Sequence, residues 1–185
     1  MADMAHFGPI HYSKVKSFKN TMEGHKFVQY MVGGHQILTE GDGGLITSVA
    51  TYEGPAYMTT TMTGLMDGHP MTTHLLVSHI PVDMDNFIIN FGVMMKKDPN
   101  ISEAGNKAMV EEYTEKNIES FHQDVAIWNN KCIIDNPLMC DGDGPIHLVR
   151  KWYSQFMTNV ADIREEQVRA REHVTLEGPS VEEVI

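Results

Sequence analysis

The sequence has few cysteines, few basic residues and no long hydrophobic run, and each shortage excludes a class of protein. Two cysteines, Cys132 and Cys140, are too few for a disulfide scaffold, so a reducing, cytoplasmic setting is expected. The 14 Lys and Arg residues are outnumbered by 25 Asp and Glu, and the net charge of −11 argues against binding to duplex nucleic acid or to an anionic membrane. No segment approaches the ~20 apolar residues of a membrane span, and the N-terminus has no signal-peptide pattern.

The composition is otherwise that of a globular protein with a sizeable core. The chain has 185 residues, of which 42% are hydrophobic and 21% are charged, which suits one domain. Ten histidines and 14 methionines are many for this length. Histidine in excess favours a metal site. Methionine in excess favours an adaptable apolar interior that can accommodate a ligand.

The first half of the chain is predicted to form strands. Segments rich in Thr, Val, Ile, Tyr and Phe are separated by Gly and Pro, a pattern typical of an antiparallel meander. We expect strands over residues 26–32, 45–52, 57–66, 72–79 and 87–95. His69, His74 and His79 recur at five-residue steps, which alternate between the two faces of a strand, so they are not expected to form one cluster.

The second half is predicted to be mainly helical. Ser102 is a suitable N-cap, and no proline follows until after residue 131, so a long helix is expected over residues 102–131. A second helix is expected from Pro145 to about residue 158, and another amphipathic helix with a loose tail within residues 161–185. A short helix over residues 2–7 is expected to end at Gly8-Pro9. The predicted fold class is α+β, a curved antiparallel sheet with a long helix packed on it.

The N-terminal pattern D-x2-H-x4-H contains candidate metal ligands. Asp3 and His6 share a face if residues 2–7 are helical, and a break at Gly8-Pro9 lets His6 and His11 turn towards one metal ion. Asp3 is placed to accept a hydrogen bond from a ligating imidazole, which would fix its orientation. The alternative is that the two histidines are surface residues near a frayed terminus.

The long helix supplies a third candidate ligand. Asp124 lies in an apolar stripe between Phe121 and Trp128, where an isolated carboxylate has a large desolvation cost unless it is paired or binds a metal. Asn117 lies two turns earlier on the same side, which suits the wall of a pocket, and we assign Asn117, Phe121 and Trp128 to substrate binding. A slightly rotated helix face would instead leave Asp124 exposed. Two histidines and one carboxylate form the facial triad of non-haem Fe(II) oxygenases.

The sequence resembles the C-terminal catalytic domain of Rieske-type non-haem iron oxygenases, and within that family the branch of 3-ketosteroid 9α-hydroxylases. The resembling segments are ADMAH with His11, FKNTMEGHKFVQY, SVATYEGPAY, QDVAIW, the DNP and DGDGP elements, and RKWYSQF. Sterol 7-desaturases share the aspartate segment and the RxWYxQF-like segment. The resemblance covers the chain to about Asp162, so we expect a catalytic domain over residues 1–162 and a charged extension over residues 163–185.

The resemblance implies a helix-grip fold, with a substrate cavity between sheet and long helix, and assigns roles to particular residues. His6, His11 and Asp124 would bind mononuclear Fe(II), and Asp3 would be the bridging carboxylate towards a [2Fe–2S] Rieske cluster. The implied partners are a steroid or other polycyclic apolar substrate, O2 and a ferredoxin reductase component, in a homotrimer.

The chain departs from the family pattern at the cluster. A Rieske centre needs C-x-H and C-x2-H elements, and neither Cys132 nor Cys140 is followed by the required histidine. The family carries its Rieske domain before the D-x2-H-x4-H motif. We therefore expect the cluster on another chain or on an upstream segment absent here. The family's asparagine just before the aspartate is replaced by Gln123.

Three functions remain open on these observations. The first is an Fe(II)-dependent monooxygenase acting on a steroid. The second is a helix-grip module that binds a sterol or another apolar ligand without turnover, because the Rieske domain is missing. The third is a metal-dependent hydrolase with Asp3 as its general base. The retained His6, His11 and Asp124 favour the first, and the hydrolase ranks last because the surrounding segments resemble those of oxygenases.

Overall fold

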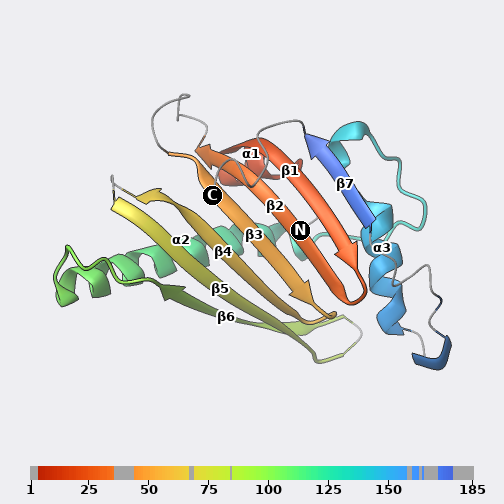
Figure 1. Cartoon of the computed structure of the whole chain (residues 1–185). Coiled ribbons are helices and arrows are strands. Elements are labelled where there is room, and N and C mark those ends of the chain that lie inside the picture. The colour runs from red at the N-terminus through yellow and green to blue at the C-terminus, as the bar shows by residue number, and fades with distance from the viewer. Residues whose placement is uncertain are drawn as a thin grey trace.

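The structure, a computed structural model, describes residues 4–35, 44–66, 69–83, 85–157, 160–162, 164 and 171–176. Its strands form one seven-stranded antiparallel sheet in the order β6-β5-β4-β3-β2-β1-β7 (Figure 1). The strands are β1 (Ser13–Glu23), β2 (Lys26–His35), β3 (Ile46–Glu53), β4 (Tyr57–Met66), β5 (His69–Pro81), β6 (Phe87–Met95) and β7 (Arg171–Leu176). The helices are α1 (Phe7–His11), α2 (Glu103–Trp128) and α3 (Ile146–Ser154), with 3-10 turns at Asp141–Asp143, Gln155–Met157 and Val160–Asp162.

The sheet is curved, and α2 crosses one of its faces (Figure 1). This α+β arrangement confirms the predicted helix-grip fold. Along β5 the buried positions alternate, and Thr73 on the helix-facing side donates a hydrogen bond to the Tyr113 hydroxyl of α2 at 3.2 Å. Phe91 of β6 and Phe121 of α2 meet edge to face with ring centroids 4.9 Å apart. These contacts hold α2 against strands β5 and β6.

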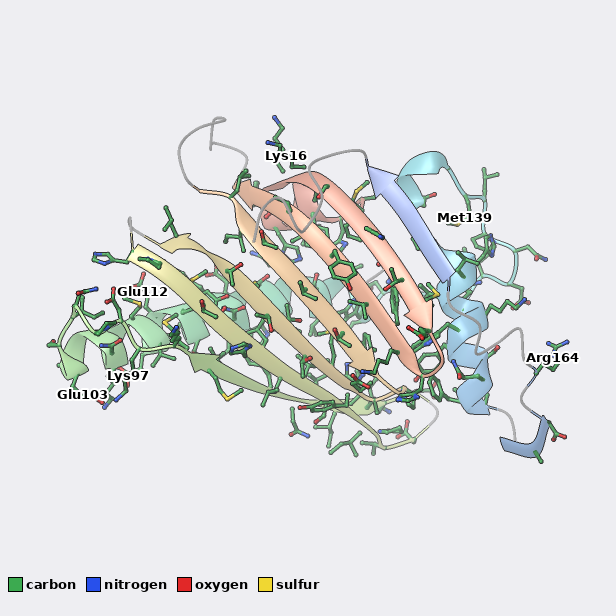
Figure 2. The ribbon with its side chains drawn as sticks, viewed as in Figure 1. Lys16, Lys97, Glu103, Glu112, Met139 and Arg164 are labelled. Atoms are coloured by element: carbon green, nitrogen blue, oxygen red, sulfur yellow. The ribbon has the colours of Figure 1, made fainter. Side chains whose placement is uncertain are left out.

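Strand β1 was not expected from the sequence, because a bulge interrupts its alternation. The β1–β2 register shifts between Val15 and Ser17. The extra residue, Lys16, lets Val15 before the bulge and Phe18 after it face the same side of the sheet, although they are three apart. The regular alternation of inward-facing and outward-facing residues that marks a strand is therefore broken in this segment. Figure 2 shows Lys16 projecting from the molecule.

The charged C-terminal segment corrects a second expectation. Residues 171–176 form β7, which pairs antiparallel with β1, where a helix was predicted within residues 161–185. Strand β1 has one edge against β2, and its other edge needs hydrogen-bonding partners that a helix cannot provide. The expected loose tail beyond residue 176 lies outside the described residues.

Both ends of α2 agree with the prediction. Ser102 caps the helix by accepting a hydrogen bond from the Gly105 amide at 3.0 Å, and the helix ends at Trp128. Lys97, in the loop after β6, donates a hydrogen bond to Glu103 in the first turn of the helix at 2.7 Å (Figure 2). Among the described residues, no helix has the length and apolar character needed to cross a membrane.

Helix α3 closes the core at the tip of the β1–β2 hairpin. Trp152 is buried and packs with Met22 and Phe27, and its indole N–H donates to the Gly24 carbonyl at 3.0 Å. The helix starts after Pro145 as predicted, ends at Ser154, and continues as a 3-10 turn. Tyr52 packs against this core and also lines the cavity described below.

Candidate metal centre

His6 and His11 lie at the two ends of a short helix. This helix begins at Phe7, where the helix predicted from the sequence was expected to end. Helix α1 spans Phe7–His11, with His6 as its N-cap and His11 in its last turn. The expected break at Gly8-Pro9 is wrong, because the first amides of a helix have no intrahelical partner and proline is therefore tolerated there. Tyr12, with φ of 51°, ends the helix and directs the chain into β1. The two imidazoles lie on one side, with ring centroids 5.2 Å apart.

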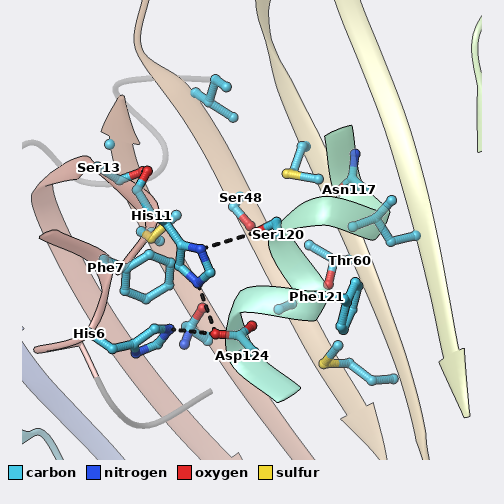
Figure 3. A pocket seen from close by; sticks show the side chains of 18 of the residues that line it. His6, Phe7, His11, Ser13, Ser48, Thr60, Asn117, Ser120, Phe121 and Asp124 are labelled. Carbon is cyan, nitrogen blue, oxygen red and sulfur yellow. Dashed lines mark hydrogen bonds and ion pairs between the residues drawn. The ribbon is translucent and has the colours of Figure 1, made fainter. Parts of the chain in front are cut away.

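Asp124 reaches these histidines from the penultimate turn of α2. Its Oδ1 lies 3.0 Å from His11 Nε2 and 3.9 Å from His6 Nε2 (Figure 3). One ligand atom from each of the three residues lies within 4.8 Å of the others. The three side chains are 13–23% exposed, so they are shielded from solvent without being sealed. The structure thus brings together the three residues that the sequence predicted as ligands.

The donor set fits a divalent transition metal. Two neutral imidazoles and one carboxylate are the ligands of non-haem Fe(II) sites. Metal–ligand bonds of roughly 2.0–2.2 Å, the values for zinc, put two ligands at right angles about 3 Å apart. The 3.0 Å separation of Asp124 Oδ1 and His11 Nε2 matches that spacing. His6 Nε2 lies farther from Asp124 Oδ1, at 3.9 Å, and all three candidate ligands line the cavity.

Helix α2 also contacts the far side of the His11 ring. Ser120 Oγ lies 3.1 Å from His11 Nδ1, and Gln123 Oε1 lies 3.1 Å from the same nitrogen. Residues 120, 123 and 124 share one helix face, so a single turn of α2 reaches both nitrogens of one imidazole. Sequence reasoning missed Ser120 and Gln123 in this arrangement, because nothing in their own spacing points to His11.

A cavity of about 520 Å³ extends from the three ligands along the inner face of the sheet. This volume lies within the range of pockets that take drug-sized ligands. Asn117, Phe121 and Trp128, the residues assigned to substrate binding, all line it. The sheet contributes an apolar wall to which Met31, Met58, Met62, Leu75 and Val77 belong, with polar Gln29, Ser48 and Thr60 among them. Figure 3 shows Ser48, Thr60 and Phe121 to the right of His6 and His11.

A second hollow of about 590 Å³ adjoins this cavity. Tyr52, His79 and Trp128 line both spaces and form the boundary between them. The rings of Tyr52 and His79 lie 5.8 Å apart. Tyr52 was not singled out in the sequence, and His79 was considered only for its spacing from His69 and His74, since the meeting of Tyr52 and His79 depends on strand register. His74 instead contacts Thr61 at 3.0 Å, so the regularly spaced histidines do not form one cluster, as expected.

Burial shifts the pKa of both polar residues at this boundary. Desolvation, helped by the nearby Tyr153, raises the pKa of Tyr52 to about 12. Desolvation also lowers the pKa of His79 below 6.5, so His79 is neutral near pH 7. The boundary is therefore uncharged at neutral pH, which suits passage or binding of an apolar ligand. Asp3, the predicted bridging carboxylate, lies outside the described residues.

Comparison with known sequences identifies the family. The family model "3-Ketosteroid 9alpha-hydroxylase C-terminal domain" matches residues 1–157. The chain belongs to this family.

Several curated relatives agree with this assignment. The chain is 38% identical over 175 residues to a "3-ketosteroid-9-alpha-monooxygenase, oxygenase component" of Rhodococcus rhodochrous, covering 91% of this chain and 45% of the relative. It is 35% identical over 173 residues to the protein of the same name from Mycobacterium tuberculosis, covering 91% and 45%. A "Cholesterol 7-desaturase" of Caenorhabditis elegans is 53% identical over 38 residues, 20% of this chain and 9% of that protein. The chain spans less than half the length of these relatives.

Proposed function

We propose that this chain is the catalytic portion of a Rieske-type non-haem iron monooxygenase that hydroxylates a 3-ketosteroid-like substrate with O2 and externally supplied electrons. The observation that carries the proposal is the convergence of His6, His11 and Asp124 at one end of an apolar cavity. A pure ligand-binding module has no need for three metal-ligating groups at that point. Membership of the 3-ketosteroid 9α-hydroxylase family supports the steroid as substrate.

Different residues of the chain bind the metal ion and the substrate. His6, His11 and Asp124 bind the ferrous ion, which supplies the O2 activation and C–H oxidation that no side chain can perform. Phe121 and Trp128 offer aromatic surfaces to the fused rings of the substrate. Asn117 donates to the Tyr113 carbonyl at 2.7 Å, which orients its amide along the cavity wall. The apolar wall excludes water, and so limits oxidation without substrate.

Electrons must come from outside the described residues. We propose that they arrive from a [2Fe–2S] Rieske cluster on another chain or on a further segment, through Asp3, and originally from a ferredoxin reductase component. The net reaction inserts one oxygen atom into a C–H bond, and the electrons together with protons reduce the other oxygen atom to water. A homotrimer, in which cluster and iron belong to different subunits, is the assembly we propose.

The domain limits and cellular setting are part of the same proposal. Residues 1–162 form the catalytic domain and residues 163–185 an extension, whose strand β7 completes one edge of the sheet. The exposed free thiols of Cys132 and Cys140 support a reducing, cytoplasmic setting.

The metal content of anaerobically purified protein tests the metal site. We expect near-stoichiometric iron in the parent and loss of iron in both His6→Ala and Asp124→Ala. His122→Ala, which removes an exposed histidine from the same helix, is the matched control and should keep its iron. Iron absent from the parent, or unaffected by the ligand substitutions, would contradict the proposal.

Intrinsic fluorescence tests the ligand. The chain has two tryptophans, of which Trp128 lines the cavity and Trp152 is buried in the α3 core. Progesterone, a 3-ketosteroid, should quench the parent saturably, and Trp128→Phe should abolish that quenching. Binding of progesterone by protein that takes up no iron would favour the ligand-binding module instead.

A further inference from the structure

One turn of α2 contacts both nitrogens of the His11 ring. Asp124 Oδ1 lies 3.0 Å from Nε2, while Ser120 Oγ and Gln123 Oε1 each lie 3.1 Å from Nδ1. Figure 3 shows His11 between Ser120 and Asp124. The His11 side chain is 13% exposed, so water competes little for these positions. The helix therefore determines the environment of a residue that lies at the other end of the chain.

We propose that Gln123, assisted by Ser120, positions His11 for metal binding by fixing its tautomer and ring orientation. The proposal rests on the proposed metal site. A side-chain carbonyl oxygen can only accept a hydrogen bond, so the proton of the neutral imidazole resides on Nδ1 and is donated to Gln123 Oε1. Nε2 then carries the lone pair, and that lone pair faces Asp124 and the space between the three ligands.

The two contacts on Nδ1 have different roles. The Ser120 hydroxyl can accept or donate, so it does not select a tautomer by itself. It lies 3.1 Å from the same nitrogen and gives Nδ1 a second polar contact, which restricts rotation of the imidazole about its Cβ–Cγ bond. Gln123 is the selecting group, because only one tautomer of His11 can donate to its carbonyl.

The same tautomer changes how the His11 imidazole and the Asp124 carboxylate interact. With the proton on Nδ1, Nε2 and Asp124 Oδ1 are both electron-rich, and at 3.0 Å they repel each other unless a cation lies between them. The Gln123 contact therefore makes the pair a better ligand for a metal ion and a poorer internal hydrogen bond. Groups that orient a ligating histidine in this way typically change metal affinity by roughly 10–100-fold.

The affinity for Fe(II) alone, measured anaerobically by competition with a chelator, tests the proposal without any turnover. We expect Gln123→Met to weaken Fe(II) binding roughly 10-fold, and Gln123→Met with Ser120→Ala roughly 100-fold. Gln123→Glu keeps an acceptor and removes the amide donors, so it should bind within a few-fold of the parent. His122→Gln, on the exposed side of α2, should match the parent.

A second measurement reports the tautomer itself. In metal-free protein, nitrogen-15 spectra should show His11 protonated at Nδ1 in the parent and in Gln123→Glu, and a mixture of the two tautomers in Gln123→Met. Parent-like affinity in the double variant, or a loss in Gln123→Glu as large as in Gln123→Met, would overturn the role of Gln123 as acceptor. A parent that binds no Fe(II) would instead overturn the metal site and this inference together, which distinguishes the two failures.

Discussion

The indole N–H of Trp152 donates a hydrogen bond to the carbonyl oxygen of Gly24, with a nitrogen–oxygen distance of 3.0 Å. Gly24 lies in the turn between β1 and β2 with φ of 54°, a conformation that costs other residues energy. Gln155 donates to the same carbonyl at 3.1 Å. Two side chains from the α3 region thus donate hydrogen bonds to one backbone oxygen of the β1–β2 hairpin. These bonds hold α3 against the end of the sheet.

Substitution of Trp152 should lower stability without affecting the metal. Trp152→Phe loses one hydrogen bond and some packing, but Gln155 still satisfies the Gly24 carbonyl, so we expect a loss of about 1–2 kcal/mol. Trp152→Ala should cost about 3–5 kcal/mol because it leaves a cavity. Urea unfolding measures both changes, as a lower midpoint with an unchanged slope. Loss of iron from Trp152→Phe would contradict the separation of this core from the metal centre.

The start of α2 offers a test of local stability. Ser102→Ala removes the acceptor for the Gly105 amide and should cost about 1 kcal/mol of unfolding free energy. Ser102→Asp keeps an acceptor and should restore the parent midpoint. Because Ser102 is exposed, the change creates no cavity. Equal stability of the alanine and aspartate variants in thermal unfolding would show that the cap contributes nothing.

A substitution in the part of the sheet that lines the cavity should reduce ligand binding and leave iron binding unchanged. Ala50 is buried and lines the cavity, so Ala50→Leu should fill part of it and weaken progesterone binding about tenfold. Iron content should stay unchanged, since no metal ligand is touched. Thr51→Leu places the same side chain on the opposite face of β3 and is the matched control. Equal quenching curves for the two variants would argue against progesterone occupying this cavity.

The partly buried Tyr52 predicts a loss of stability at high pH. Its folded-state pKa of about 12 lies above the ordinary value of 10.0, so the folded protein keeps this proton more tightly than the unfolded chain does. The stabilisation is complete below pH 10 and declines as the pH rises from 10 to 12, by at most roughly 1.4 kcal/mol per pH unit. In denaturation curves at several pH values, Tyr52→Phe should show a smaller decline than the parent. Identical declines would mean that Tyr52 titrates normally.

Much of the fold was predictable because its signals are local. Strands β3 to β6 are marked by Thr, Val and Ile between Gly and Pro, and α2 by its cap and its apolar stripe. Strand β1 was missed because the bulge at Lys16 breaks the alternation. Helix α1 was misplaced because Pro9 was interpreted as a helix breaker, whereas in a first turn it has no hydrogen bond to lose.

The meeting of the three candidate ligands was predictable from the sequence, and their surroundings were not. His6, His11 and Asp124 combine a recognisable motif with a carboxylate in an apolar stripe. The role of Gln123 depends on its contact with His11, which is distant in the sequence and comes close only in the fold. Tyr52 and His79 meet through strand register, a property of paired strands that no single segment encodes.

The candidate metal ligands and the cavity wall come from different parts of the chain, and this has a consequence for how such a protein can diversify. Within the described residues, all three candidate ligands belong to α1, its cap and α2, whereas the strands contribute only wall. Inward-facing strand residues can therefore change which molecule fits while the three candidate ligands stay in place. A one-residue insertion within α2 ahead of residue 120 would do the reverse, because it rotates Ser120, Gln123 and Asp124 away together by about 100°. Ligand preference is thus open to gradual change, and metal binding is retained or lost as a unit.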